Sequence, residues 1–90
     1  TDALFRWGGD EFIILTYGNA ANAAAVAERL RGIFAESLQP DAGRGRKKLR
    51  ATISCGVAEF RKGDTMDSVL SKADAALYRA KSKGRNRVEV

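Results

Sequence analysis

The sequence of 90 residues contains no histidine and only one cysteine, one proline and one tryptophan. Without histidine, the chain lacks the commonest metal-binding side chain and the one that ordinarily changes charge near neutral pH. The single cysteine, Cys55, cannot form an internal disulfide. These absences exclude zinc sites built from cysteine and histidine. The low proline content and the 44% of hydrophobic residues instead predict a compact domain.

Long apolar runs are also missing, since no stretch approaches the roughly 20 residues of a transmembrane helix. The chain begins without the basic and apolar segments of a secretory signal. We therefore expect a cytoplasmic location, or the cytoplasmic part of a membrane-bound sensor, with no direct membrane contact from this segment. The net charge of +5 favours phosphate-bearing partners, which include nucleotides and nucleic acids alike.

The first third of the chain has the pattern of a β-hairpin. Residues 3–7 and 11–16 are rich in aromatic and β-branched residues, and they flank a glycine pair at 8–9 that can form a tight turn. Residues 12–15 are apolar at successive positions, which is typical of a strand that is covered on both faces. This segment is predicted to be a central strand.

Two amphipathic helices are predicted. The first covers residues 19–38 and has Asn19 or Asn22 as its N-cap. Its apolar stripe consists of Ala23, Val26, Ala27, Leu30, Ile33, Phe34 and Leu38. The second begins at Asp64 or Thr65 and ends at Gly84 in C-cap position.

Between the helices, residues 39–50 are predicted to form a loop that contains the basic run 44–48 and continues into a strand near Leu49. Residues 52–58 and 88–90 are predicted strands. The order of elements indicates an α/β fold in which helices pack on a mainly antiparallel sheet. Residues 1–90 are interpreted as one domain, and because the chain opens inside a hairpin we expect further residues before it.

The sharpest local feature is the run Gly8-Gly9-Asp10-Glu11. Glycines let a phosphate approach the backbone, and carboxylate oxygens are the ligands that Mg²⁺ or Mn²⁺ prefers. The plainer alternative is a hairpin turn that uses glycine for its conformation and the two acids for solubility. Consecutive strand residues point to opposite faces, so both carboxylates reach one metal only if the turn is irregular.

The string RWGGDEF at residues 6–12 resembles the signature of the GGDEF family of diguanylate cyclases. Residues 52–58 (TISCGVA) are similar to a strand of that family, with Cys55 in place of the usual isoleucine. Residues 73–81 and 84–88 resemble its last helix and the turn beyond it. Three ordered motifs over nearly the whole chain identify it as the C-terminal portion of a GGDEF domain.

The resemblance implies a role for each matching site residue. Asp10 would be a metal ligand and possible proton acceptor, with Glu11 supporting the metal. The residues expected to bind the phosphates of GTP are Gly8, Gly9, Lys81 and Arg85. Without the motif, a lysine and an arginine at the end of a helix would serve only to complement the helix dipole.

A second site in the family binds the cyclic product and inhibits the enzyme. Asp2 lies at the position of the aspartate in this inhibitory motif, and its partner arginine would precede Thr1. Arg29 resembles a secondary arginine that binds product from a helix. The alternative for Arg29 is a solvated charge on the helix surface.

The implied reaction joins two GTP molecules into cyclic di-GMP with release of pyrophosphate, and it uses Mg²⁺ or Mn²⁺. Because each domain of this family binds one GTP, a homodimer through GGDEF domains is implied, together with an upstream sensory or receiver domain. A complete family member begins with a strand that carries a metal-binding aspartate. This chain lacks that strand, so we expect little or no activity from the 90 residues alone and an open central position in the sheet.

Two other functions fit part of the sequence. The chain could be a catalytically silent GGDEF module that binds nucleotide or regulates a neighbouring domain. A small basic RNA-binding sheet is the third hypothesis, but the strands lack the aromatic pattern that stacks RNA bases. We therefore expect no nucleic-acid partner.

Overall fold

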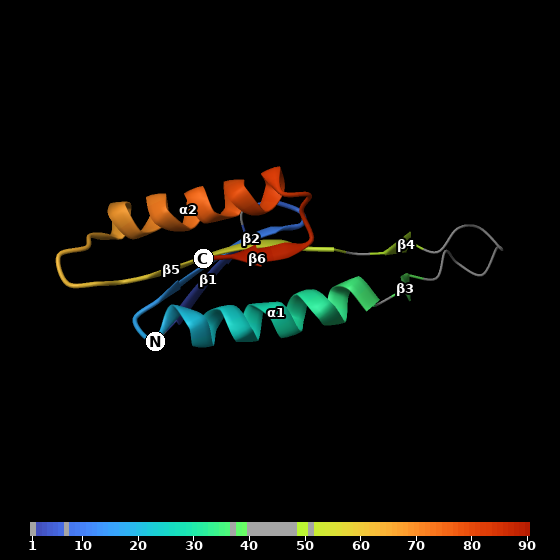
Figure 1. Cartoon of the computed structure of the whole chain (residues 1–90), viewed down its shortest axis with the longest axis horizontal. Coiled ribbons are helices and arrows are strands. Elements are labelled where there is room, and N and C mark those ends of the chain that lie inside the picture. Colours follow the sequence, from blue (N-terminus) through green and yellow to red (C-terminus); the bar gives the residue numbers. More distant parts are fainter. Residues whose placement is uncertain (1, 7, 37, 40–48, 51) are drawn as a thin grey trace.

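The computed structural model describes residues 2–6, 8–36, 38–39, 49–50 and 52–90. It has three layers, with α2 on one face of a four-stranded sheet and α1 on the other (Figure 1). In chain order the elements are β1 (Asp2–Arg6), β2 (Glu11–Thr16), α1 (Ala20–Glu36), β3 (Leu38–Gln39), β4 (Leu49–Arg50), β5 (Ser54–Glu59), α2 (Met66–Ser82) and β6 (Arg87–Glu89). The layered α/β architecture expected from the sequence is confirmed.

The hairpin of β1 and β2 forms as predicted, with Arg6 opposite Phe12 and Asp2 opposite Thr16. Side chains alternate along β2, so Ile13 and Leu15 enter the core beneath α2 while Ile14 enters the core beneath α1. All three are buried. Because β2 is buried on both faces, its apolar run is unbroken, and β2 is confirmed as a central strand.

The pairing of the sheet differs from the mainly antiparallel arrangement that we expected. The strand order is β1-β2-β5-β6; β1 pairs antiparallel with β2, but β2 with β5 and β5 with β6 pair in parallel. The reason is that α1 lies between β2 and β5 in the chain and α2 lies between β5 and β6. A strand reached through such a crossover runs parallel to its predecessor.

The open central position expected in the sheet is not found among the described strands. β2 pairs directly with β5 along its whole length, from Glu11 opposite Ser54 to Thr16 opposite Glu59. Both faces of this pair are covered by helices, so the centre of the sheet is closed. The strand expected near Leu49 is β4, which pairs antiparallel with β3 outside the main sheet.

Helix α2 packs closely on β5 because position 56 is glycine. A Cβ atom on Gly56 would collide with the backbone oxygen of Ala73 and the backbone nitrogen of Leu77. The N-cap of the helix is Thr65, whose hydroxyl accepts a hydrogen bond from the Ser68 amide at 3.1 Å, in a reciprocal capping box. Its C-cap is Lys83, one residue before the predicted Gly84.

Helix α1 is capped by Asn19, whose side chain accepts a hydrogen bond from the Ala21 amide at 2.7 Å. It ends at Glu36 rather than at the predicted residue 38, which lies in β3. Of the predicted apolar stripe, the members within α1 that are buried are Ala23 and Ala27. The larger members are exposed: Val26, Leu30, Ile33 and Phe34.

This exposed side of α1 continues into an apolar cavity of about 160 Å³ beside β1. Its lining residues are Leu4, Phe12, Ile14, Ala27, Leu30, Phe34, Ile53 and Cys55. The predicted stripe is therefore only partly a core contact, because the described elements cover the small residues and leave the large ones open.

Some predictions concern residues outside this description. The basic run 44–48, Trp7 and Thr1 lie outside the described residues, as does the side chain of Asp2. Neither described helix is long and apolar enough to cross a bilayer.

Candidate active site

The turn between β1 and β2 places two glycines at the end of the sheet. The Gly8 amide donates a hydrogen bond to the Glu11 carbonyl oxygen at 3.1 Å, which closes the turn. A Cβ atom on Gly8 would lie 3.4 Å from the carboxyl group of Glu11, whereas nothing lies within 4 Å of the corresponding position on Gly9. The space at the Cβ position of Gly9 is therefore unfilled by the described residues.

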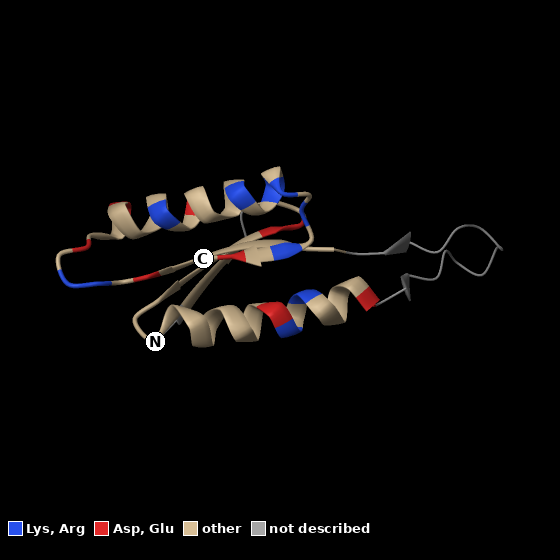
Figure 2. Ribbon diagram, in the orientation of Figure 1, with Lys and Arg blue, Asp and Glu red and all other residues tan. Residues whose placement is uncertain are grey.

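Glu11 brings this turn together with two cations from the other end of the sequence. Its Oε1 lies 3.4 Å from Nζ of Lys81, and its Oε2 lies 3.6 Å from Nη1 of Arg85. Glu11 occupies the face of β2 toward α2, as Ile13 does two residues later, which is why it meets the end of that helix. Figure 2 shows basic residues at the C-terminal end of α2 beside acidic residues at the start of β2.

The two ion pairs leave the cations accessible. The side chains of Lys81 and Arg85 are 33% and 53% exposed, against 20% for Glu11. Ion pairs at such exposure contribute at most about 1 kcal/mol to stability. A phosphate group could therefore compete with Glu11 for both cations at little cost to the fold.

The turn that carries Arg85 has an unusual backbone. Gly84, Arg85 and Asn86 all have positive φ, at 110°, 64° and 49°. The Arg85 amide donates to the Ala80 carbonyl at 2.8 Å, and the Asn86 amide donates to Oγ of Ser54 at 3.1 Å. These bonds hold a conformation that is uncommon for residues other than glycine.

Ser54 joins the two turns of the site, and the sequence did not single it out. It is buried at the start of β5, its amide donates to the Asp10 carbonyl at 2.9 Å, and its hydroxyl accepts from Asn86. The only feature of the local sequence that could have indicated Ser54 is that it is a small polar residue in a strand of small residues. Its role depends on the register that sets Ser54 opposite Glu11, which local sequence does not reveal.

Asp10 is the least engaged of the predicted residues. It is exposed, and its carboxylate makes no hydrogen bond or ion pair with the described part of the chain. Within the described residues 2–6, 8–36, 38–39, 49–50 and 52–90, no cluster of three or more acidic, histidine or cysteine ligands forms. Asp10 and Glu11 nevertheless suit Mg²⁺, which commonly binds one or two carboxylates together with waters and substrate phosphates.

Comparison with known proteins identifies the fold that carries this site. Residues 1–87 match the family model described as "Diguanylate cyclase, GGDEF domain". The chain belongs to the GGDEF family. The resemblance of RWGGDEF and the later segments to this family is thereby confirmed.

The relatives of this GGDEF domain include named cyclases and a response regulator. It is 41% identical to diguanylate cyclase A of Treponema denticola over 90 residues, 97% of this chain and 23% of that protein. It is 40% identical to the response regulator PleD of Caulobacter vibrioides, over 92% of this chain and 18% of that protein. It is 38% identical to diguanylate cyclase DgcM of Escherichia coli, over 97% of this chain and 20% of that protein. The chain thus spans about a fifth of the length of these relatives.

A solved structure agrees with the GGDEF assignment. The crystal structure of the GGDEF domain of DgcB from Caulobacter crescentus, in complex with c-di-GMP, superposes with a TM-score of 0.75 and 33% sequence identity. The match covers 98% of this chain and 52% of that one. The chain therefore corresponds to about half of the solved domain.

The two residues predicted for product inhibition lie on different elements, Asp2 on β1 and Arg29 on α1. Asp2 pairs with Thr16 at the end of the hairpin farthest from the glycine turn. Arg29 is exposed on α1, and its side chain makes no hydrogen bond or ion pair with the described residues. Their assignment stays a prediction.

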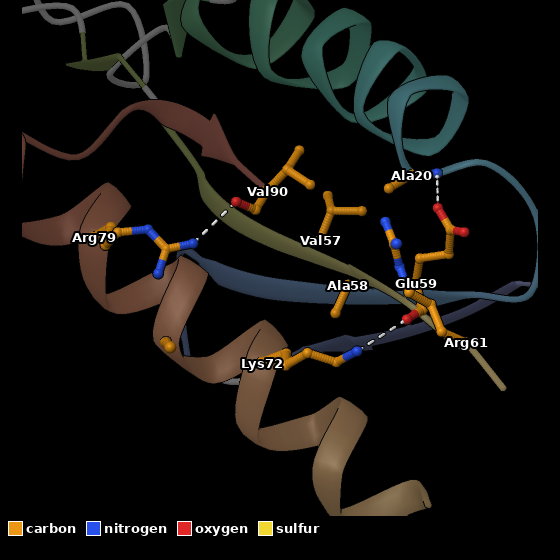
Figure 3. A pocket seen from close by; sticks show the side chains of 9 residues that line it. Ala20, Val57, Ala58, Glu59, Arg61, Lys72, Arg79 and Val90 are labelled. Carbon is orange, nitrogen blue, oxygen red and sulfur yellow. Dashed lines mark hydrogen bonds between the residues drawn. The ribbon is translucent and has the colours of Figure 1, made fainter. Parts of the chain in front are cut away.

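A separate cavity of about 280 Å³ lies at the opposite end of β5 and contains none of the predicted site residues (Figure 3). Three of its polar side chains are engaged in structural contacts. Lys72 binds Asp64 at 2.8 Å, Arg79 donates to the Val90 carbonyl at 2.9 Å, and Glu59 accepts a hydrogen bond from the Ala20 amide at 2.9 Å. These three contacts connect residues from different elements around the cavity.

Proposed function

We propose that this GGDEF domain is part of a diguanylate cyclase, which condenses two molecules of GTP into cyclic di-GMP and two of pyrophosphate. The observation that carries the proposal is the meeting of Glu11 with Lys81 and Arg85 beside the glycine turn. Relatives named diguanylate cyclase support it. The DgcB domain, which binds c-di-GMP, supports the nucleotide class.

In this reaction the 3′-hydroxyl of each GTP attacks the α-phosphorus of the other. One phosphorus–oxygen bond forms at each attacking oxygen, the bond to the leaving pyrophosphate breaks, and the hydroxyl proton is released. Lys81 and Arg85 would hold the triphosphate, whose negative charge replaces the carboxylate of Glu11 as their partner. Preorganised charges of this kind act mainly by stabilising the charge of the transition state.

Asp10 and Glu11 are proposed to hold Mg²⁺ or Mn²⁺. A divalent cation supplies charge neutralisation on the phosphates and lowers the pKa of a bound hydroxyl. Glu11 leaves its two basic partners when phosphate binds, which frees its oxygens for this role. Asp10 needs no such exchange, because its carboxylate has no partner among the described residues.

The assembly around this site is also proposed. Two domains, each with one GTP, face one another in a homodimer, and an upstream sensory or receiver domain controls their approach. PleD, a response regulator, is a relative consistent with such control. We further propose that the protein acts in the cytoplasm, where GTP is available.

The test is GTP turnover with Mg²⁺ by the full-length protein, compared between Lys81→Ala and Lys83→Ala. Both lysines lie at the end of α2, but Lys83 pairs with Glu89 at 3.1 Å, away from Glu11. We expect Lys81→Ala to lower kcat/KM by about 10- to 100-fold, the range for loss of a charged hydrogen bond. Lys83→Ala should leave turnover unchanged.

Two results would decide against the proposal. Equal loss in both lysine variants would show that Lys81 does not contact the phosphates. A full-length protein that binds GTP but forms no cyclic di-GMP would support the silent module instead. Where the wild-type protein does turn over GTP, Asp10→Asn should abolish turnover, which tests the metal-binding role proposed for this residue.

A further inference from the structure

Arg31 on α1 reaches across to the turn that carries Arg85. Its guanidinium is held from one side by Glu28, through Nε to Oε1 at 2.9 Å and Nη2 to Oε2 at 2.6 Å. The remaining nitrogen, Nη1, donates to Oδ1 of Asn86 at 2.8 Å. This contact joins residues that are 55 positions apart in the sequence.

The Glu28 pair fixes the direction of the guanidinium. The guanidinium group is planar. When a carboxylate binds two of its nitrogens, the direction of the third nitrogen is fixed as well. The hydrogen bond from Arg31 lowers the pKa of Glu28 below its usual value, so the pair is formed at neutral pH. Arg31 is thus oriented before it meets Asn86.

Asn86 is in turn held from two sides. Its side-chain oxygen accepts a hydrogen bond from Arg31 of α1. Its backbone amide donates a hydrogen bond to the hydroxyl oxygen of Ser54 in β5. Asn86 follows Arg85 directly, and both have positive φ. A positive φ is uncommon for residues other than glycine. Two consecutive residues in this conformation therefore need contacts that keep them there.

We propose that Arg31 is a positioning residue, which holds the Asn86 side chain from α1 and thereby fixes the turn that presents Arg85 to the phosphate site. The link to phosphate rests on the proposed function. The chain of contacts runs from Glu28 through Arg31, Asn86 and Ser54 to the Asp10 carbonyl. Helix α1 is therefore connected to both turns of the site although it contributes no group to it.

The first experiment is hydrogen exchange of the full-length protein without nucleotide, read by mass spectrometry on peptides that cover residues 83–88. Arg31→Met should speed exchange there by about two- to tenfold, the range for loss of one hydrogen bond. Arg31→Lys, which can still donate to Asn86, should restore part of the protection. Arg79→Met is the matched control, because that arginine donates to the Val90 carbonyl and not to the turn.

Asn86→Gly provides the second variant. Glycine tolerates the φ of 49° but removes the acceptor, so it should reproduce the effect of Arg31→Met. If the two residues act through one contact, the double variant should exchange no faster than either single one. Additive effects, or unchanged exchange at residues 83–88 in Arg31→Met, would overturn the proposal.

The kinetic experiment connects the turn to substrate. Arg31→Met should raise KM for GTP by about two- to tenfold with kcat little changed, since a loosened Arg85 weakens triphosphate binding. Faster exchange with an unchanged KM would refute the link to the phosphate site. A wild-type protein that neither binds nor converts GTP would refute the proposed function, while the exchange result would still decide whether Arg31 holds the turn.

Discussion

At the scale of single residues, Cys55 illustrates how burial determines chemistry. Its thiol lies in the core between β5 and α1, next to Ile14 and Val57. Desolvation raises the pKa of Cys55 from 9.0 to about 11. At neutral pH the side chain is a neutral apolar group, in accord with its place in the core.

The first residue-scale prediction follows from that pKa. Native protein at pH 8 should react with Ellman's reagent far more slowly than protein unfolded in guanidinium, because only the thiolate attacks the reagent. The raised pKa also means that this group stabilises the fold fully below pH 9, and the contribution disappears as the pH rises through about 11. Equal reaction rates in the native and unfolded protein would show that Cys55 is not buried.

At the scale of elements, the contact between α2 and β5 depends on one missing side chain. Gly56→Ala should destabilise the domain by about 3 kcal/mol or more, because the colliding atoms belong to the backbone of α2 and cannot rotate away. Gly32→Ala is the matched control: it lies within α1, has nothing within 4 Å of the Cβ position, and should stabilise by about 0.5–1 kcal/mol. Urea unfolding of both variants measures the difference, and similar free energies would contradict the packing.

The elements themselves were largely predictable from local sequence. The glycine turn, the double burial of residues 12–15 and the caps at Asn19 and Thr65 follow from signals within a few residues. The parallel pairing of β2 with β5 was not predictable in this way, because it depends on which strands the helices connect. The exposure of Ile33 and Phe34 was missed for the same reason: periodicity identifies an apolar face but not what covers it.

The site was predicted in part. The resemblance selected Glu11, Lys81 and Arg85, and the structure brings these three together. It could not select Ser54, whose buried hydroxyl matters only because two turns meet at it. A residue that positions others through non-local contacts leaves no pattern in its own neighbourhood.

At the scale of the whole molecule, several large apolar side chains are exposed on α1 and beside it. They are Val26, Leu30, Ile33 and Phe34 of α1, with Leu4 of β1 next to them. Contiguous patches of this kind bind apolar dyes. We expect the 90-residue chain to enhance the fluorescence of anilinonaphthalene sulfonate.

Substitution tests which surface is responsible. Ile33→Lys should lower the dye signal severalfold, whereas Tyr78→Lys on α2 should not, although Tyr78 is 69% exposed against 61% for Ile33. Circular dichroism of both variants verifies that the helices are kept. An equal decrease in the two variants would place dye binding elsewhere.

The ion pair between Glu11 and Lys81 joins residues that are 70 positions apart. During translation the glycine turn leaves the ribosome long before α2 and the last turn are made. A nascent chain in which Glu11 has left the ribosome but Lys81 and Arg85 have not carries the carboxylate of the site without its cations. The proposed phosphate site is therefore complete only after residues 81–85 have emerged, which couples its formation to a late step of synthesis.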